Sequence, residues 1–184
     1  CCAMVSVASA QAVPERIGVG IFGGGFEGDA TYDSGPTYDV RATYAPLSFL
    51  TLELTLGMVD TSMLAREQNQ VSSARDARLI TTSLSSLLFL AEGRIHPYLI
   101  FGVGSITDEE SYLAGNLGLG AGYAIDSSWS LRAEGRAWLS NDAPATDRFQ
   151  HLQVAFGVMY EWGGNADLDG DGIPNLVDKC RSDA

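Results

Sequence analysis

The sequence predicts an all-β protein: an eight-stranded antiparallel up-and-down transmembrane β-barrel with a short C-terminal calcium-loop segment. Three observations carry this prediction. Apolar residues recur at every second position, which is the period of a β-strand. The sequence has no run of about 18 apolar residues, the length that a membrane-spanning helix requires. The connections between the alternating segments are short and long in turn.

The alternation is clearest in residues 49–59, where leucines share one face and Thr51, Glu53, Thr55 and Gly57 share the other. Three further segments show the same pattern, and four fit it less cleanly. Helical spacing explains none of them well, and proline and glycine are scattered through them. In chain order, the eight predicted strands are residues 16–26, 37–44, 49–59, 78–90, 96–105, 113–125, 128–140 and 151–162.

The connections differ in length and polarity. Three are tight, with the sequences APLS, AEGRI and DSS, and four are longer and polar, at 27–36, 60–77, 105–112 and 140–148. In an antiparallel meander this alternation places all short turns at one end, and an even number of strands places both chain ends there too. Outer-membrane barrels have this layout, with short periplasmic turns and longer external loops. We therefore expect the C-terminal tail to lie in the periplasm.

The two faces of the predicted strands differ, because the larger face is apolar and the smaller one carries charges and glycines. A soluble, lipocalin-like barrel would hide the apolar face. We favour the reverse arrangement, with lipid outside and paired charges in a lumen that side chains fill. These charges either rigidify the barrel or gate a narrow ion path, and the small lumen favours the first interpretation. The predicted lumen charge network is Arg41, Glu53, Arg132, Glu134 and Arg136.

Four stretches rich in glycine and aromatic residues carry a family resemblance: HPYLIFGVG (96–104), NLGLGAGYAI (116–125), LRAEGRAWL (131–139) and FGVMYEW (156–162). Through them, residues 13–163 resemble the OmpA-like family of eight-stranded outer-membrane barrels. The last stretch looks like the C-terminal signal that the barrel-insertion machinery reads. The resemblance implies a location in the Gram-negative outer membrane, with membrane lipid around the barrel.

The stretch NADLDGDGIPNLVDKC (165–180) is an acidic ladder near the end of the chain. Side-chain oxygens occupy positions 1, 3, 5, 9 and 12 of a twelve-residue loop, a glycine occupies position 6, and a backbone carbonyl would serve at position 7. This spacing suits Ca²⁺, which takes six to eight oxygen ligands. A disordered acidic linker is the alternative. The predicted ligands are Asp167, Asp169, Asp171, Ile173, Asn175 and Asp178.

The ladder resembles a thrombospondin type 3 repeat, with Pro174 and Cys180 following its aspartates. An EF-hand would need a helix on each side and usually a glutamate in the last position. We assign residues 164–184 to this calcium-binding linker. In OmpA-like proteins such repeats often join the barrel to a peptidoglycan-binding domain, so the resemblance implies peptidoglycan as a partner through a domain beyond this sequence.

Residues 1–12 (CCAMVSVASAQA) are small and apolar and end in an A-x-A cleavage site. We expect them to be the remnant of a secretory signal peptide; a lipid-anchored end at Cys1 is the alternative. Cys180 is then the single cysteine of the remaining chain, which indicates a disulfide partner beyond the visible end. We expect the chain to be a fragment at both ends.

Charge and motifs restrict the function. A net charge of −12 with 11 lysines and arginines argues against nucleic-acid binding. Lipid A deacylases carry a serine two residues after a histidine, whereas His151 is followed there by Gln153, and His96 fits a turn residue. We therefore predict no enzymatic activity and favour a structural anchor. The alternatives are a narrow low-conductance pore, a lipid-modifying enzyme, or a surface adhesin acting through residues 60–77.

Overall fold

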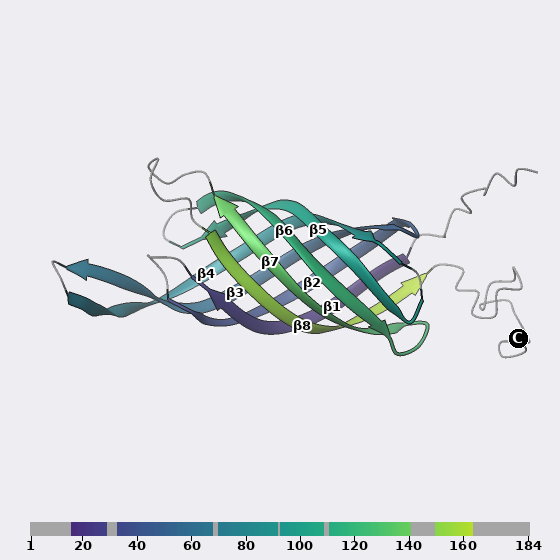
Figure 1. The fold of residues 1–184 in the computed structure, drawn as a ribbon, viewed down its shortest axis with the longest axis horizontal. Coiled ribbons are helices and arrows are strands. Elements are labelled where there is room, and N and C mark those ends of the chain that lie inside the picture. Colours follow the sequence, from purple (N-terminus) through teal and green to yellow (C-terminus); the bar gives the residue numbers. More distant parts are fainter. Residues whose placement is uncertain are drawn as a thin grey trace, which may run out of the picture.

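Eight strands form one closed antiparallel barrel, in which each strand pairs with its neighbours in the chain (Figure 1). This computed structural model confirms the predicted eight-stranded antiparallel barrel, whereas the predicted C-terminal calcium-loop segment lies outside the described residues. It describes residues 16–28, 33–67, 70–91, 93–108, 111–140 and 150–163, of which 63–75, 140 and 150 are described by their backbone alone. The strands are β1 (Arg16–Glu27), β2 (Gly35–Leu47), β3 (Leu50–Glu67), β4 (Gln70–Phe89), β5 (Ile95–Thr107), β6 (Ser111–Ala124), β7 (Trp129–Ser140) and β8 (Gln150–Gly163).

The barrel closes where β1 pairs with β8, from Arg16 opposite Gly163 to Glu27 opposite Leu152. Closure leaves no open sheet edge within the barrel wall, so the backbone polar groups of the wall find partners in neighbouring strands. In the described part of the chain, no helix is long and apolar enough to span a membrane.

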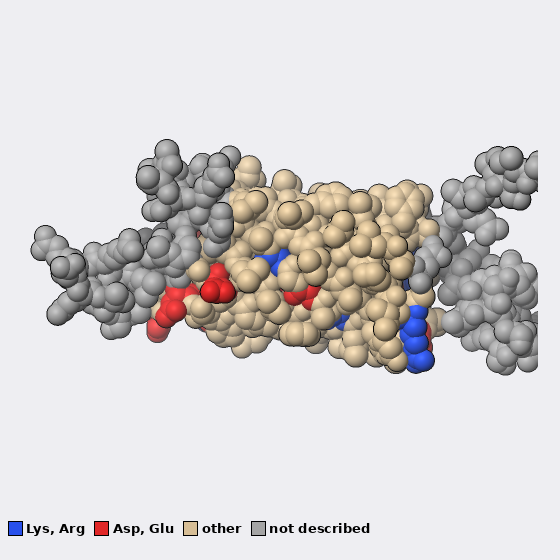
Figure 2. Space-filling view, in the orientation of Figure 1, with Lys and Arg blue, Asp and Glu red and all other residues tan. Residues whose placement is uncertain are grey.

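Side chains alternate between the lumen and the outside, as the period-two pattern predicts. In β2, Thr37, Asp39, Arg41 and Thr43 are buried, whereas the residues between them are exposed. Most outward positions are apolar; among the large hydrophobic residues the most exposed is Leu113, with 71% of its surface accessible. In Figure 2 the barrel wall is almost free of charge, and charged side chains gather toward the two ends. The soluble-barrel alternative requires the opposite arrangement and is therefore wrong.

The short turns gather at one end of the barrel, together with the described ends of β1 and β8 (Figure 1). In the turn between β6 and β7, one carboxylate oxygen of Asp126 accepts hydrogen bonds from the backbone N–H groups of Ser128 and Trp129, each at 2.8 Å. In the turn between β4 and β5, Gly93 has a φ of 126°, a backbone conformation that residues with a Cβ atom rarely adopt. We call the end of the barrel that carries these short turns the inner end.

The predicted loop 60–77 is mostly strand. β3 continues to Glu67 and β4 begins at Gln70, and these two residues pair. The pairing of β3 with β2 ends at Val59, and that of β4 with β5 begins at Ile80, so a two-stranded hairpin extends past the barrel wall (Figure 1). The polarity of the segment suggested a loop, but polar residues also suit a hairpin with water on both faces, because its ladder satisfies the backbone.

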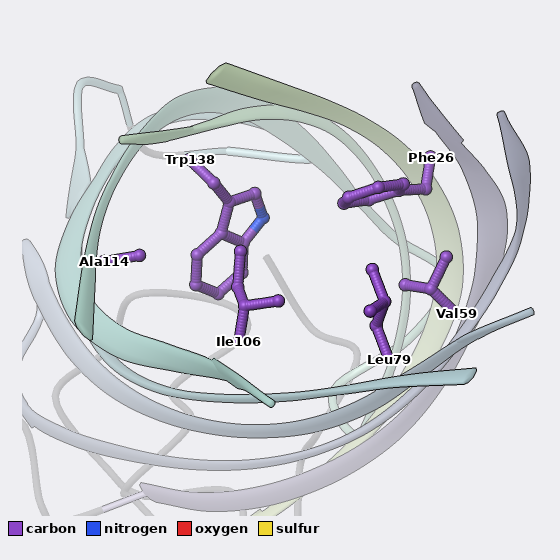
Figure 3. Packing of buried hydrophobic residues seen from close by; sticks show 6 residues of the cluster. All are labelled: Phe26, Val59, Leu79, Ile106, Ala114 and Trp138. Atoms are coloured by element: carbon purple, nitrogen blue, oxygen red, sulfur yellow. The ribbon is translucent and has the colours of Figure 1, made fainter. Parts of the chain in front are cut away.

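At the end opposite the inner end, which we call the outer end, the lumen holds a cluster of buried apolar side chains from six strands (Figure 3). Trp138 is the largest of them and is 1% exposed. Smaller apolar clusters lie deeper, one around Phe22 and Met159 and one around Leu87 and Tyr98. The outer apolar cluster consists of Phe26, Val59, Leu79, Ile106, Ala114 and Trp138.

Candidate functional site: the charged lumen

The middle of the lumen holds a connected set of buried ions. The structure brings together all five residues of the predicted network: Arg41 from β2, Glu53 from β3, and Arg132, Glu134 and Arg136 from β7. Each is at most 5% exposed. The three residues of β7 face the same way because they are two positions apart on one strand.

Glu134 lies at the centre of this network. Its Oε1 atom accepts hydrogen bonds from Arg136 Nε at 2.7 Å and from Arg41 Nη1. Its Oε2 atom accepts a hydrogen bond from the Tyr98 hydroxyl at 3.2 Å. Both carboxylate oxygens of Glu134 are therefore engaged, and two guanidinium groups share one of them.

Glu53 makes the second junction. Its Oε1 atom accepts a hydrogen bond from Arg136 and lies 3.6 Å from Arg41 Nη1. Its Oε2 atom is 3.5 Å from Arg132 Nη1. All three buried arginines thus contact Glu53, which connects β3 with β2 and β7 across the lumen.

Sequence reasoning did not assign two further members of the network. Asp39 accepts a hydrogen bond from Arg41 at 2.9 Å, and Gln153 donates to the same Asp39 oxygen at 2.9 Å. Gln153 in turn accepts a hydrogen bond from Trp138 Nε1 at 3.2 Å, which joins the ions to the outer apolar cluster. The available signal was the alternation itself, because Asp39 lies two positions before Arg41 on the same face.

Inward glycines position the aromatic residues of this network. A Cβ atom at Gly120 would lie 2.6 Å from the ring of Tyr98, its partner on β5. Phe22 likewise packs over Gly157, its partner on β8, and the Arg41 guanidinium lies 3.6 Å from the centre of the Phe22 ring. Glycines inside apolar strands therefore make room for bulky neighbours that orient the ions.

The buried charges balance. Arg41, Arg132 and Arg136 face the carboxylates of Asp39, Glu53 and Glu134; a fourth carboxylate, that of Glu161, pairs with Arg132 at 2.7 Å near the inner end. Removing charges from water is costly unless each gains partners, which these ions do. The arrangement fixes strands to one another across the lumen, because Glu53 and Glu134 each contact a guanidinium group of another strand.

The other predicted site residues lie elsewhere. The calcium ligands Asp167, Asp169, Asp171, Ile173, Asn175 and Asp178 are outside the described residues, as are the predicted signal remnant and Cys180. His151 is buried in the lumen with its ring 4.9 Å from that of Phe26, and His96 lies at the start of β5. Among the described residues, no group of three or more histidine, cysteine, aspartate or glutamate side chains is placed to hold a metal.

The fold is that of the small eight-stranded barrels found in outer-membrane proteins. No protein-family model matches the chain, and no curated protein sequence matches it. Solved structures do match it. The outer membrane protein OprG from Pseudomonas aeruginosa is 13% identical with a TM-score of 0.59, and the match covers 83% of this chain and 98% of that chain.

Two other structures match over a similar share. A major outer membrane protein from Thermus thermophilus is 16% identical, with a TM-score of 0.58 and coverage of 80% of this chain and 99% of that chain. The N-terminal β-barrel domain of Pseudomonas aeruginosa OprF is 14% identical, with a TM-score of 0.55 and coverage of 82% and 99%. At these identities the likeness shows a shared fold.

Proposed function

We propose that this protein is a structural anchor of the bacterial outer membrane. The barrel holds the chain in the membrane, and residues 164–184 form a calcium-binding periplasmic spacer that leads to a peptidoglycan-binding domain beyond this sequence. The observation that carries the proposal is the combination of an apolar outer wall with a lumen filled by paired ions and the outer apolar cluster. A wall of this kind suits lipid, and a filled lumen suits a rigid body rather than a conduit.

Membrane embedding is tested by placing a charge on the outer wall. Leu117 lies in the middle of β6 and is 60% exposed. Leu117→Arg is expected to destabilise the barrel by about 2–4 kcal/mol in lipid, because arginine at mid-membrane depth must leave water. Unfolding by guanidinium in vesicles measures the loss.

Leu113→Arg is the matched control. Leu113 faces outward on the same strand, but near its outer end, and is 71% exposed. Near the interface the same substitution is expected to cost about 0–1 kcal/mol. Equal losses at the two positions, or none at either, would mean that the wall does not face a membrane interior.

The calcium spacer is proposed from the oxygen spacing of residues 167–178. Four aspartates repel one another without a metal, and a divalent cation neutralises them while Gly172 permits the sharp turn at position six. Their short side chains limit reach, so one loop is expected to bind Ca²⁺ weakly, in the range of about 10⁻⁴ to 10⁻³ M.

Calorimetry of the whole chain with Ca²⁺ measures this binding. The double substitution Asp169→Ala and Asp171→Ala is expected to abolish the heat. Substituting two exposed acidic residues outside the loop, Glu27→Ala and Asp33→Ala, serves as the control and is expected to leave the heat of Ca²⁺ binding unchanged. If no heat is seen, or if all four substitutions act alike, residues 164–184 are an acidic linker without a calcium loop.

A narrow pore is the second candidate function, and the buried ion pairs favour it over the remaining alternatives. An exchange of partners among Arg41, Glu53 and Glu134, which already share short contacts, could open a path for ions. The conductance measurement in the Discussion distinguishes the pore from the anchor.

A further inference from the structure

Arg94 is an exposed residue of the short turn between β4 and β5, at the inner end of the barrel. Its Nε atom donates a hydrogen bond to the backbone carbonyl of Ala124 at 3.3 Å, and its guanidinium lies over the Tyr123 ring, 5.2 Å from the ring centre. A guanidinium at this distance is attracted to the face of an aromatic ring. The β6 residues Tyr123 and Ala124 therefore hold the Arg94 side chain at the rim of the outer wall.

The charge of Arg94 is not neutralised within the part of the chain that the structure describes. The other arginines whose side chains are described all pair with carboxylates, both in the lumen and at the two ends of the barrel. Arg94 forms no such pair there, and its one described side-chain hydrogen bond uses Nε. Its two terminal amino groups are thus available to a ligand, and a guanidinium fork of this kind suits the oxygens of a phosphate group.

A shallow groove of about 420 Å³ on the outer wall is also lined by Tyr123. The shape of the groove follows from side-chain size. Ala121 and Ala133 are paired neighbours on β6 and β7, and they are small, whereas Tyr123, Leu131 and Phe156 around them are large. These five side chains point away from the lumen and are exposed. The groove is therefore an apolar depression in the lipid-facing wall.

The groove leads from the rim into the wall. Tyr123 and Leu131 are the lining residues of β6 and β7 that lie nearer the inner end, and Ala121 and Ala133 follow toward the middle of the two strands. A cation thus stands where the wall ends, and an apolar channel begins beside it. A ligand that satisfies both parts carries an anionic group joined to an alkyl chain, which is the chemistry of a phospholipid.

We propose that Arg94, Tyr123 and this groove bind one phospholipid of the membrane leaflet nearest the inner end. The terminal amino groups of Arg94 donate to the phosphate oxygens, and one acyl chain lies along Ala121 and Ala133. The proposal rests on the membrane embedding that is part of the proposed function, but not on the calcium spacer or the peptidoglycan-binding domain.

The test uses the whole chain folded in detergent micelles, with phosphatidylglycerol added and the protein–lipid complexes counted by native mass spectrometry. One phosphatidylglycerol molecule is expected to bind the natural barrel in a saturable manner. Diacylglycerol with the same acyl chains lacks the phosphate and is expected to bind about tenfold more weakly. Arg94→Gln is expected to weaken the binding of phosphatidylglycerol by about tenfold as well, because a hydrogen-bonded charge is lost.

The groove has its own variant. Ala133→Phe fills the groove from the lipid side and is expected to weaken the binding of phosphatidylglycerol several-fold, because the acyl chain loses contacts with the wall. Ala42→Phe is the matched control, since Ala42 faces outward on β2 and does not line the groove. Arg78→Gln is the control for charge, since Arg78 pairs with Asp60. Both controls are expected to leave the binding unchanged.

Several results would overturn the proposal. These are equal affinity of the natural barrel and Arg94→Gln for phosphatidylglycerol, equal affinity of the natural barrel for phosphatidylglycerol and diacylglycerol, and equal losses in Ala133→Phe and Ala42→Phe. If inorganic phosphate displaces the lipid and Ala133→Phe has no effect, Arg94 binds free phosphate and the lipid site is wrong. Each of these results leaves the membrane embedding in place, because Leu117→Arg tests the embedding separately.

Discussion

Glu134→Ala is expected to lower the free energy of unfolding by about 3–5 kcal/mol, the cost of removing one partner from a buried ion pair. Glu134 accepts hydrogen bonds from Arg41 and Arg136 and from the Tyr98 hydroxyl, and all of these groups are buried. Without the carboxylate, three buried arginines share fewer anions, and the Tyr98 hydroxyl loses its acceptor. Denaturant unfolding in vesicles, together with the gel shift between folded and heated barrel, measures the effect.

Two comparisons isolate the cause. Glu134→Gln keeps the shape of the side chain but not its charge. We expect it to lower the free energy of unfolding by less than Glu134→Ala does. Asp60→Ala breaks an ion pair with Arg78 of similar length, 2.9 Å, but the two side chains are 44% and 66% exposed. An exposed pair contributes about 0–1 kcal/mol. If Asp60→Ala and Glu134→Ala cost the same, the lumenal ions are hydrated and contribute little.

Trp138→Ala is expected to cost about 3–5 kcal/mol, the usual loss for a large aromatic residue in a core. Trp138 is 1% exposed, packs in the outer apolar cluster, and donates a hydrogen bond to Gln153. Alanine leaves a cavity at the outer end of the lumen and an amide oxygen without its donor. Because the cluster narrows the lumen at that end, we also expect the substituted barrel to pass more ions than the natural one.

Conductance across planar lipid bilayers measures this passage of ions. The natural barrel is expected to show no conductance steps above background, and Trp138→Ala is expected to raise the conductance. Trp129→Ala is the control: Trp129 faces outward, is 45% exposed, and its ring centre lies 4.8 Å from that of Tyr160 in a tilted arrangement. Trp129→Ala is expected to lower the free energy of unfolding by less than Trp138→Ala does. It is expected to leave the conductance unchanged, because lipid chains refill the space on the outer wall. Regular conductance steps in the natural barrel would favour the narrow pore over the anchor.

Much of the barrel could be predicted from the sequence, because the rule that places each side chain is local. Alternation alone assigns residues such as Glu53 and Arg132 to the lumen and Leu54 and Leu131 to the outside. The strand count follows from the same pattern, and the closed order follows from antiparallel neighbours with short and long connections.

Partners across the lumen could not be predicted in this way. The contact between Asp39 and Gln153 joins positions 114 apart, and it depends on barrel stagger, which no single segment specifies. Trp138 interrupts the polar face of its strand, so its role in closing the outer end becomes visible only when six strands meet. The hairpin past Val59 looked like a loop because its residues are polar.

The buried ion pairs join residues that lie far apart in the sequence, and this has a consequence for the assembly of the barrel. Arg41 binds Glu134 at a separation of 93 positions, and Glu53 binds Arg136 at 83. During synthesis, β2 and β3 carry two buried carboxylates, Asp39 and Glu53, against one arginine, Arg41, and they emerge long before β7, which supplies Arg132 and Arg136 to Glu53. A partly built sheet entering lipid would carry an excess buried carboxylate into hydrocarbon, which is strongly unfavourable. Insertion and closure of this barrel should consequently occur as one concerted event, because β7 supplies the arginines that complete the charge balance inside the lumen.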